Sequence, residues 1–235
     1  MKLNMTSFVF LLGILSLSYG TRNIRITNNC RFKVWPGWQG TSGTPNGGGA
    51  TLNPGQYVDV GVPDNWTGGR VWARTGCDGN FNCETGGCGN SEHCNGRWGE
   101  VGVTLAEFGL GQWNGLDFYD VSLVDGFNVQ VQIKAYNGEG DCRTIGGCHA
   151  DIISQCPNEL RRNRNGHTVE CLSACTAFGK EEYCCTGSHN SAQSCPPTNY
   201  SRFFKDRCPT DYSYAFDDAT STFTCKHANY EVIFC

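Results

Sequence analysis

Carboxylates that lie in or beside apolar segments are the residues of this sequence best suited to do chemistry. Asp120 and Asp125 flank the largely apolar residues 121–124, and Glu107 directly precedes an aromatic residue, an unusual place for a purely solvated charge. Hydrolysis of a glycosidic bond requires one protonated and one charged carboxyl group. Clustered carboxylates raise each other's pKa, so one can stay protonated near neutral pH. Each residue taken alone is equally well a surface carboxylate beside a turn.

Two further charged residues are placed to join such a site. Arg70 begins an alternating apolar segment and can pair with a carboxylate, and Asp217 opens the pair Asp217-Asp218 before a threonine-rich segment. A sugar ligand would also need aromatic rings to stack on its faces; the candidates, each equally plausible as a core residue, are Trp113, Phe118 and Tyr119. The sequence contains no Gly-x-Ser-x-Gly element and no Walker-type phosphate loop, which argues against those chemistries.

The segments that must position these side chains are mostly strands. Residues 127–135 alternate apolar and polar side chains, with the period of a sheet that has one buried face. Similar alternation occurs in five other segments: residues 23–27, 57–62, 69–74, 221–224 and 230–234. Turns rich in glycine and proline, such as residues 40–49, separate the strands. We therefore expect a mainly β protein whose core is a flattened antiparallel β-sandwich or barrel.

Two cysteine-rich segments depart from the strand pattern. Residues 76–104 form a small disulfide-rich loop region with little apolar content, so disulfides must hold it. Residues 148–208 form a disulfide-rich helical region, with helices expected over residues 150–156 and 168–178. The β core would comprise about residues 21–75, 105–147 and 209–235. Residues 21–235 form one domain, because no linker, repeat or charge block divides them.

The N-terminus predicts a secreted, extracellular protein. Lys2 precedes an apolar run at residues 8–17 that is too short to span a bilayer, and a cleavage site follows Gly20. We interpret residues 1–20 as a removed signal peptide; a membrane anchor is the alternative, although polar sequence follows directly. In the oxidising secretory route, sixteen cysteines predict eight disulfides rather than metal ligands. We expect no metal and no cofactor.

The charge of the chain argues against two classes of partner, and two motifs indicate possible sites of modification. The formal net charge of −4 provides no basic excess for nucleic acid, and the sequence shows no cationic amphipathic helix for direct membrane insertion. N-glycosylation sequons occur at Asn65, in a polar turn, and at Asn199, the weaker candidate because apolar Phe203 and Phe204 follow. We expect a monomer.

Six short motifs are distinctive when taken together. The stretch GNFNCETGGC occupies residues 79–88. The others are RVWART at residues 70–75, TLAEF at 104–108, VDGFNV at 124–129, EYCC at 182–185 and YSRFFK at 200–205. With all sixteen cysteines in order, they resemble the thaumatin-like family, the pathogenesis-related group-five defence proteins. The resemblance covers essentially the whole of residues 21–235.

Sixteen cysteines allow too many pairings for the disulfides to be derived from the sequence. The resemblance implies eight pairs: Cys30–Cys235, Cys77–Cys83, Cys88–Cys94, Cys142–Cys225, Cys148–Cys208, Cys156–Cys171, Cys175–Cys184 and Cys185–Cys195. Within this set, the bridge between Cys30 and Cys235 closes almost the entire chain. It would be worth roughly 5 kcal/mol in the loop-entropy treatment.

The resemblance also implies an acidic cleft between the β core and the helical region. Its lining would be Arg70, Glu107, Asp120, Asp125 and Asp217. Any catalysis would fall to Glu107 with Asp120 or Asp125. The leading hypothesis is a secreted antifungal or antimicrobial protein that binds β-1,3-glucan or another microbial wall polysaccharide, with at most weak hydrolysis. Two alternatives stay open: an endo-β-1,3-glucanase with a digestive or defensive role, and a non-enzymatic stress or inhibitor protein that binds another protein.

Overall fold

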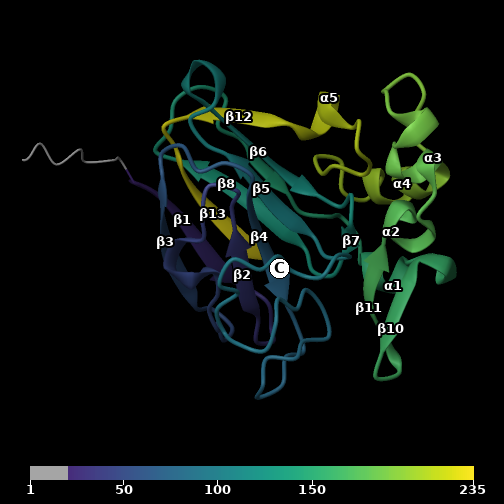
Figure 1. The fold of residues 1–235 in the computed structure, drawn as a ribbon, viewed down its shortest axis with the longest axis horizontal. Helices are drawn as coiled ribbons and strands as arrows, with labels where there is room; N and C mark the ends of the chain where they lie inside the picture. The colour runs from purple at the N-terminus through teal and green to yellow at the C-terminus, as the bar shows by residue number, and fades with distance from the viewer. Residues whose placement is uncertain (1–20) are drawn as a thin grey trace, which may run out of the picture.

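Two five-stranded sheets pack face to face in the computed structural model, which describes residues 21–235 (Figure 1). The predicted signal peptide, residues 1–20, lies outside the described residues. In spatial order, the first sheet contains β3 (Tyr57–Pro63), β1 (Thr21–Asn28), β13 (Asn229–Phe234), β8 (Val131–Tyr136) and β9 (Thr144–Gly146). The second contains β12 (Phe223–Lys226), β6 (Leu116–Ser122), β5 (Leu105–Gly109), β4 (Gly69–Arg74) and β2 (Trp35–Gln39). The mainly β sandwich is confirmed.

Alternating side chains build the core of the sandwich. Along β1, Ile24 and Ile26 are buried, while the positions between them face outward. The ring of Tyr230 from β13 lies 5.2 Å from Phe108 and 5.1 Å from Tyr119, both of which belong to the second sheet. This apolar burial between the sheets is the main stabilising contribution. One pairing differs from the antiparallel expectation, because β1 and β13, the first and last strands, run parallel.

The strand expected over residues 127–135 is interrupted. Its first residue belongs to β7 (Gly126–Phe127), which joins a separate sheet, and β8 begins only after a break. The break contains Asn128, whose buried side chain donates to the Ala73 carbonyl and accepts from the Thr104 amide. These hydrogen bonds replace the ladder bonds that a continuous strand would make, so alternation alone does not reveal the break.

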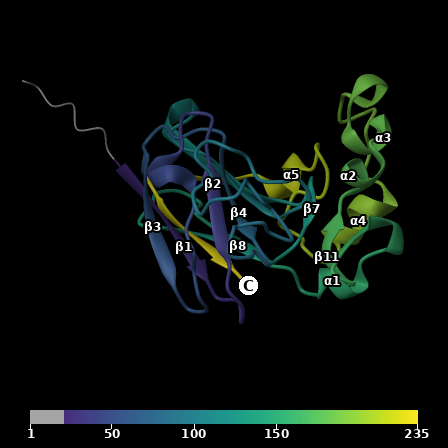
Figure 2. The same ribbon diagram turned by 60° about the horizontal axis from the view of Figure 1, so that its bottom comes forward.

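A helical region lies beside the sandwich (Figures 1 and 2). It contains a sheet of order β10 (Arg161–Arg164), β11 (His167–Leu172) and β7, and the helices α1 (Ile152–Gln155), α2 (Ala174–Phe178), α3 (Glu181–Cys184) and α4 (Asn199–Lys205). The short helix α5 (Asp218–Ser221) then leads into β12. Four 3₁₀ turns complete the elements: Pro45–Gly48, Trp113–Gly115, Asn158–Leu160 and Gly187–His189. No helix within residues 21–235 is long and apolar enough to cross a membrane.

The helix expected over residues 168–178 forms only in its second half. The first half is strand β11, in which Cys171 pairs with Phe127 of β7. The helix begins after Ser173, whose hydroxyl accepts a hydrogen bond of 3.1 Å from the Thr176 amide, a standard N-cap. The apolar spacing in this short segment fits a strand as well as a helix, and the sheet partner decides between them.

The structure forms eight disulfides, and they are the pairs that the family resemblance implies. They join Cys30–Cys235, Cys77–Cys83, Cys88–Cys94, Cys142–Cys225, Cys148–Cys208, Cys156–Cys171, Cys175–Cys184 and Cys185–Cys195. Two of them, Cys156–Cys171 and Cys148–Cys208, contribute to a separate apolar core of the helical region, which also contains Leu123, Phe127, Ile152, Leu160 and Phe204. The helical region is therefore stabilised by burial as well as by bridges.

The small loop region is not held by disulfides alone, contrary to expectation. Trp72 of the second sheet forms an apolar cluster with two of its bridged cysteines and two nearby aliphatic residues: Cys88, Cys94, Val103 and Leu105. The guanidinium of Arg74, fully buried, donates to the carbonyls of Ser91 and Glu92 in the loop and of Trp35 in β2. Burial lowers the pKa of Arg74 to about 10. These carbonyl contacts fix the loop against the sheet.

Candidate functional site

Three charged side chains form a row across adjacent strands of the second sheet. Arg70 of β4 lies opposite Glu107 of β5, and Glu107 lies opposite Asp120 of β6. Residues directly opposite each other in a sheet point to the same face. That face is the outer one, because the residues that follow or precede them in the strands are buried in the sandwich core: Val71, Ala106 and Val121.

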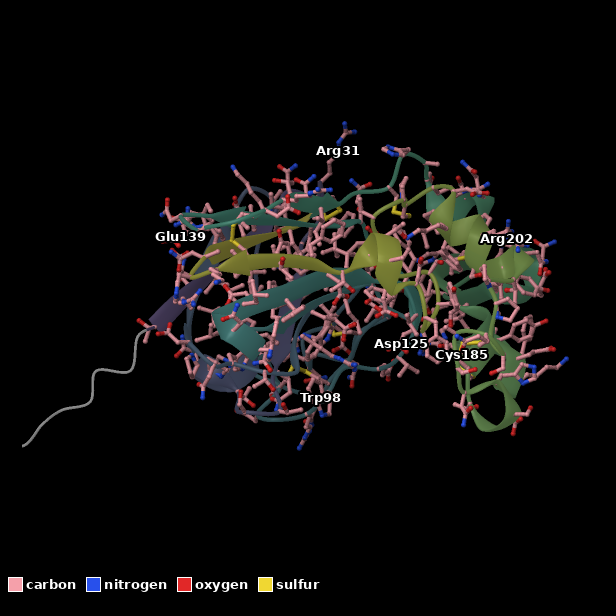
Figure 3. The ribbon with its side chains drawn as sticks, turned by 90° about the horizontal axis from the view of Figure 1, so that it is seen from above. Arg31, Trp98, Asp125, Glu139, Cys185 and Arg202 are labelled. Atoms are coloured by element: carbon pink, nitrogen blue, oxygen red, sulfur yellow. A yellow bond between two sulfur atoms is a disulfide. The ribbon has the colours of Figure 1, made fainter. Side chains whose placement is uncertain are left out.

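A cleft of about 340 Å³ opens over this row. Its lining adds Asp125 and Ser122 from the end of β6 and the loop that follows, and Tyr212 and Asp218 from the segment that returns from the helical region. Figure 3 shows Asp125 between the sandwich and the helical region. Four of the five predicted cleft residues therefore lie together: Arg70, Glu107, Asp120 and Asp125.

The two carboxyl groups of the row differ in their partners. The Nε atom of Arg70 lies 2.7 Å from Oε1 of Glu107, an ion pair. Asp120 has no such partner, and its buried Oδ1 has no hydrogen bond among the described residues. Burial raises the pKa of Asp120 well above its usual value, the negative charge of Glu107 raises it further, and Arg70 opposes both. Asp120 is thus a carboxyl group that can remain protonated beside a charged one.

Asp125 forms the far side of the same cleft. Burial raises the pKa of its carboxyl group, and the positive charge of Arg70 partly offsets this effect. It therefore offers a second carboxyl group whose protonation responds to its surroundings. Asp120 and Asp125 thus bring two carboxyl groups with raised pKa values into the cleft that also holds the Arg70–Glu107 ion pair.

Asp217, the fifth predicted lining residue, is not among the residues that line the cleft. Its Oδ2 atom lies 3.0 Å from Nζ of Lys205 and accepts hydrogen bonds from the amide and hydroxyl of Ser213, at 3.0 and 2.9 Å. These contacts turn the carboxylate away from the cleft and toward α4. Its neighbour Asp218 lines the cleft instead and accepts a 2.8 Å hydrogen bond from the hydroxyl of Tyr212.

The cleft continues past the ion pair into a second hollow of about 420 Å³, which shares Arg70, Glu107 and Asp120. Trp98 and Phe118 add aromatic rings to this hollow. We call the two hollows together the acidic groove. Phe118 stands opposite Gly109 in the neighbouring strand, so no side chain covers it from that position.

Trp98 is the functional candidate that the sequence did not indicate. It is 45% exposed, and the guanidinium of Arg70 lies 5.5 Å from the centre of its ring. Figure 3 shows it on the loop region at the edge of the sandwich. Of the rings proposed from the sequence, only Phe118 lines the groove. Tyr119 is fully buried and donates to a backbone carbonyl, and Trp113 is 79% exposed but lines neither hollow.

The candidate metal cluster and the two glycosylation sequons lie outside the acidic groove. One cluster within residues 21–235 has the spacing to hold a metal ion, Cys148 with Cys208 and Asp211, but the two sulfur atoms are joined in a disulfide and are not free thiolates. Both sequon asparagines, Asn65 and Asn199, are exposed. Burial therefore does not make Asn199 the weaker glycosylation candidate.

Comparisons with known proteins agree with the fold and the motifs. The Thaumatin family profile matches residues 28–235. A pathogenesis-related thaumatin-like protein 3.5 from Cryptomeria japonica is 50% identical over 92% of this chain and 90% of its own length. A glucan endo-1,3-beta-glucosidase from Prunus avium is 42% identical over 97% of each chain. A laminaripentaose-producing beta-1,3-glucanase from Paenibacillus barengoltzii, solved with laminarihexaose, shares the fold with a TM-score of 0.61 at 13% identity, over 98% of this chain and 81% of its own.

Proposed function

The chain belongs to the thaumatin family, among its pathogenesis-related members, and we propose that it is a secreted defence protein that binds β-1,3-glucan of microbial walls through the acidic groove. One observation carries the proposal: the row of Arg70, Glu107 and Asp120 has Trp98 and Phe118 directly beside it. Charged hydrogen-bonding groups next to open aromatic rings suit a ligand with hydroxyls at its rim and apolar faces.

The groove offers a distinct contact for each part of a glucan. Glu107 and Asp125 accept hydrogen bonds from sugar hydroxyls, and Arg70 donates to ring or hydroxyl oxygens. Protonated Asp120 can donate as well as accept. The rings of Trp98 and Phe118 provide flat surfaces for the C–H faces of the sugars. The names of a 42% identical relative and of a protein with the same fold, both beta-1,3-glucan hydrolases, support this ligand class.

Two independent features support secretion. Eight disulfides within residues 21–235 require an oxidising compartment to form and persist. The N-terminal segment has the pattern of a signal peptide. A protein that meets a microbial wall must be outside the cell that makes it, so the proposed compartment and the proposed ligand agree.

Co-sedimentation with insoluble β-1,3-glucan tests the binding. Glu107→Gln removes the negative partner of Arg70 and should weaken binding about tenfold or more, because a hydrogen bond to a charged group is worth about 1.5–3 kcal/mol. The matched control is Asp59→Asn, which breaks another exposed cross-strand pair, with Arg25, on the other sheet. Wild-type protein that stays in the supernatant would overturn the proposal, and antifungal activity without sedimentation would favour a protein partner.

Weak hydrolysis is the second candidate function, and the raised pKa of Asp120 beside Glu107 favours it. Asp120 would donate its proton to the leaving glycosidic oxygen, while Glu107 or Asp125 attacks the sugar or activates water. The test is release of reducing ends from laminarin, which Asp120→Asn should abolish without loss of sedimentation. Release no greater than that of boiled protein would exclude hydrolysis and leave binding intact.

A further inference from the structure

A second groove lies between the sandwich and the helical region. It has a volume of about 520 Å³, and its walls come from the loop before β2, the end of β4, α1 and β11. Lys33 is one of the residues that line this groove. Arg31, two residues before Lys33, lies on the opposite side of the molecule from Trp98 and Asp125 of the acidic groove (Figure 3). We call it the rear groove. Its volume falls in the range of about 300–1,000 Å³ that is typical of ligand sites.

Aromatic rings form one wall of the rear groove. Phe32 is 49% exposed and Trp35 is partly buried. The Lys33 ammonium lies 5.6 Å from the centre of the Trp35 ring. The acidic groove contains the same combination, because Arg70 lies over Trp98 there. An aromatic side chain that is half exposed in a groove gains more from a ligand with an apolar face than from water.

Polar groups also line the rear groove, and they have hydrogen-bonding capacity left. The Glu84 carboxylate accepts a 2.6 Å hydrogen bond from Asn165 through one oxygen, and the other oxygen lies 3.5 Å from Nε2 of His167. A carboxylate has about four acceptor positions, so some stay open to a ligand. The His167 side chain is 58% exposed, and Lys33 forms no ion pair within residues 21–235.

We propose that the rear groove, lined by Phe32, Trp35, Glu84 and His167, is a second carbohydrate site for a neutral β-glucan segment. Lys33 and Glu84 offset each other's charge, which favours an uncharged ligand. A sugar ring would place its C–H face on the aromatic wall and its hydroxyls against Glu84 and His167. The identity of the glucan rests on the proposed function.

Two separate sites, which share no lining residue, would let one molecule contact two glucan chains. When both sites bind at once, the second binding event becomes intramolecular. The protein is then retained on an insoluble polymer far more strongly than by either site alone. The rear groove lacks a row of carboxyl groups like that of the acidic groove, so it would hold glucan without cleaving it. Retention on a wall would then not depend on the groove where any chemistry occurs.

Amide chemical shifts recorded with laminarihexaose as the probe test the second site. The wild-type protein should show shifts of residues 33–35 and 167–169 as well as of residues around Glu107. Phe32→Ala should weaken the rear-groove response about fivefold, the loss expected for one aromatic contact, and leave the response around Glu107 unchanged. The matched control is Tyr57→Ala, which removes a ring that is 55% exposed and lines neither groove.

The outcomes separate the second site from the proposed function. Shifts confined to the residues around Glu107 would overturn the second site and keep the proposed function. Shifts confined to residues 167–169 would keep the second site and overturn glucan binding in the acidic groove. Rear-groove shifts produced by indole but not by laminarihexaose would also overturn the proposal, since the groove would then be a site for flat aromatic molecules. If Phe32→Ala lowers the melting temperature, Glu84→Gln provides the same comparison at a polar lining residue.

Discussion

Replacing Glu170 by glutamine should remove part of the dependence of stability on pH. Glu170 lies on β11 and is fully buried. One carboxylate oxygen accepts a 2.6 Å hydrogen bond from Nη1 of Arg162, and the other has no partner among the described residues. Burial raises the pKa of Glu170 from 4.5 to about 7, although the Arg162 charge opposes the change. The folded protein therefore holds a proton at Glu170 that the unfolded chain releases.

The sign of the effect follows from proton binding. Between pH 4.5 and pH 7 the folded state binds more protons at Glu170 than the unfolded state does, so its contribution to stability falls as the pH rises. A pKa difference of about 2.5 corresponds to a total loss of about 3 kcal/mol. About 2 kcal/mol of this loss falls between about pH 5 and pH 7.

Glutamine does not titrate, and its carbonyl oxygen can still accept the hydrogen bond from Arg162. The free energy of unfolding of Glu170→Gln, relative to the wild type, should therefore rise by about 2 kcal/mol from about pH 5 to pH 7. Urea unfolding followed by tryptophan fluorescence, with disulfides intact, measures this difference. The control is Glu100→Gln, the same chemical change at a side chain that is 53% exposed and lies 3.5 Å from Arg164.

An equal dependence on pH in the variant and the wild type would refute the reasoning. It would mean that Glu170 is already charged in the folded protein at pH 5, and that the contact with Arg162 outweighs burial. A control variant that changes as much as Glu170→Gln would assign the effect to surface charge near Arg162 and Arg164 rather than to the buried group.

Three further predictions concern the groove and its supports. Trp98→Ala should weaken sedimentation with glucan about fivefold at an unchanged melting temperature, as one aromatic contact is lost; equal sedimentation would remove Trp98 from the site. Arg74→Met should lower the free energy of unfolding by about 3 kcal/mol, because buried carbonyls lose their donor, and a change below 1 kcal/mol in urea unfolding would contradict this. Phe204→Ala should cost about 3–5 kcal/mol and speed amide exchange in α4 more than in β13; uniform acceleration would argue against a separate helical core.

Local pattern predicts the strands of the site but not their register. Alternation identifies residues 69–74 as a strand because apolar side chains recur at every second position. That Glu107 stands between Arg70 and Asp120 depends on two cross-strand registers, which join residues far apart in the sequence. Only the family resemblance brings these residues together before the structure does, because nothing near any one of them specifies its partner.

Two features of the groove could not be read from local sequence, for the same reason. Asp217 and Asp218 are neighbours with the same type of side chain. Which of them lines the groove depends on Lys205 and Ser213, which hold Asp217 away from it. Trp98 lies in a segment without periodicity. Its position depends on the apolar cluster around Trp72 and on the Arg74 guanidinium, which lie beneath the loop region. The residues next to Trp98 in the sequence do not indicate these contacts.

The groove keeps its shape because its two sides belong to different cores. The row of Arg70, Glu107 and Asp120 stands on a sheet whose other face packs into the sandwich core. Residues 212–218 follow Cys208, which the helical core and its bridge to Cys148 hold in place. Neither side can move inward to neutralise or cover Asp120 without disrupting its own core. Separate support thus maintains a half-buried carboxyl group whose Oδ1 has no hydrogen bond within the described residues, which a single collapsing core would not tolerate, and it leaves little reorganisation for a ligand to drive.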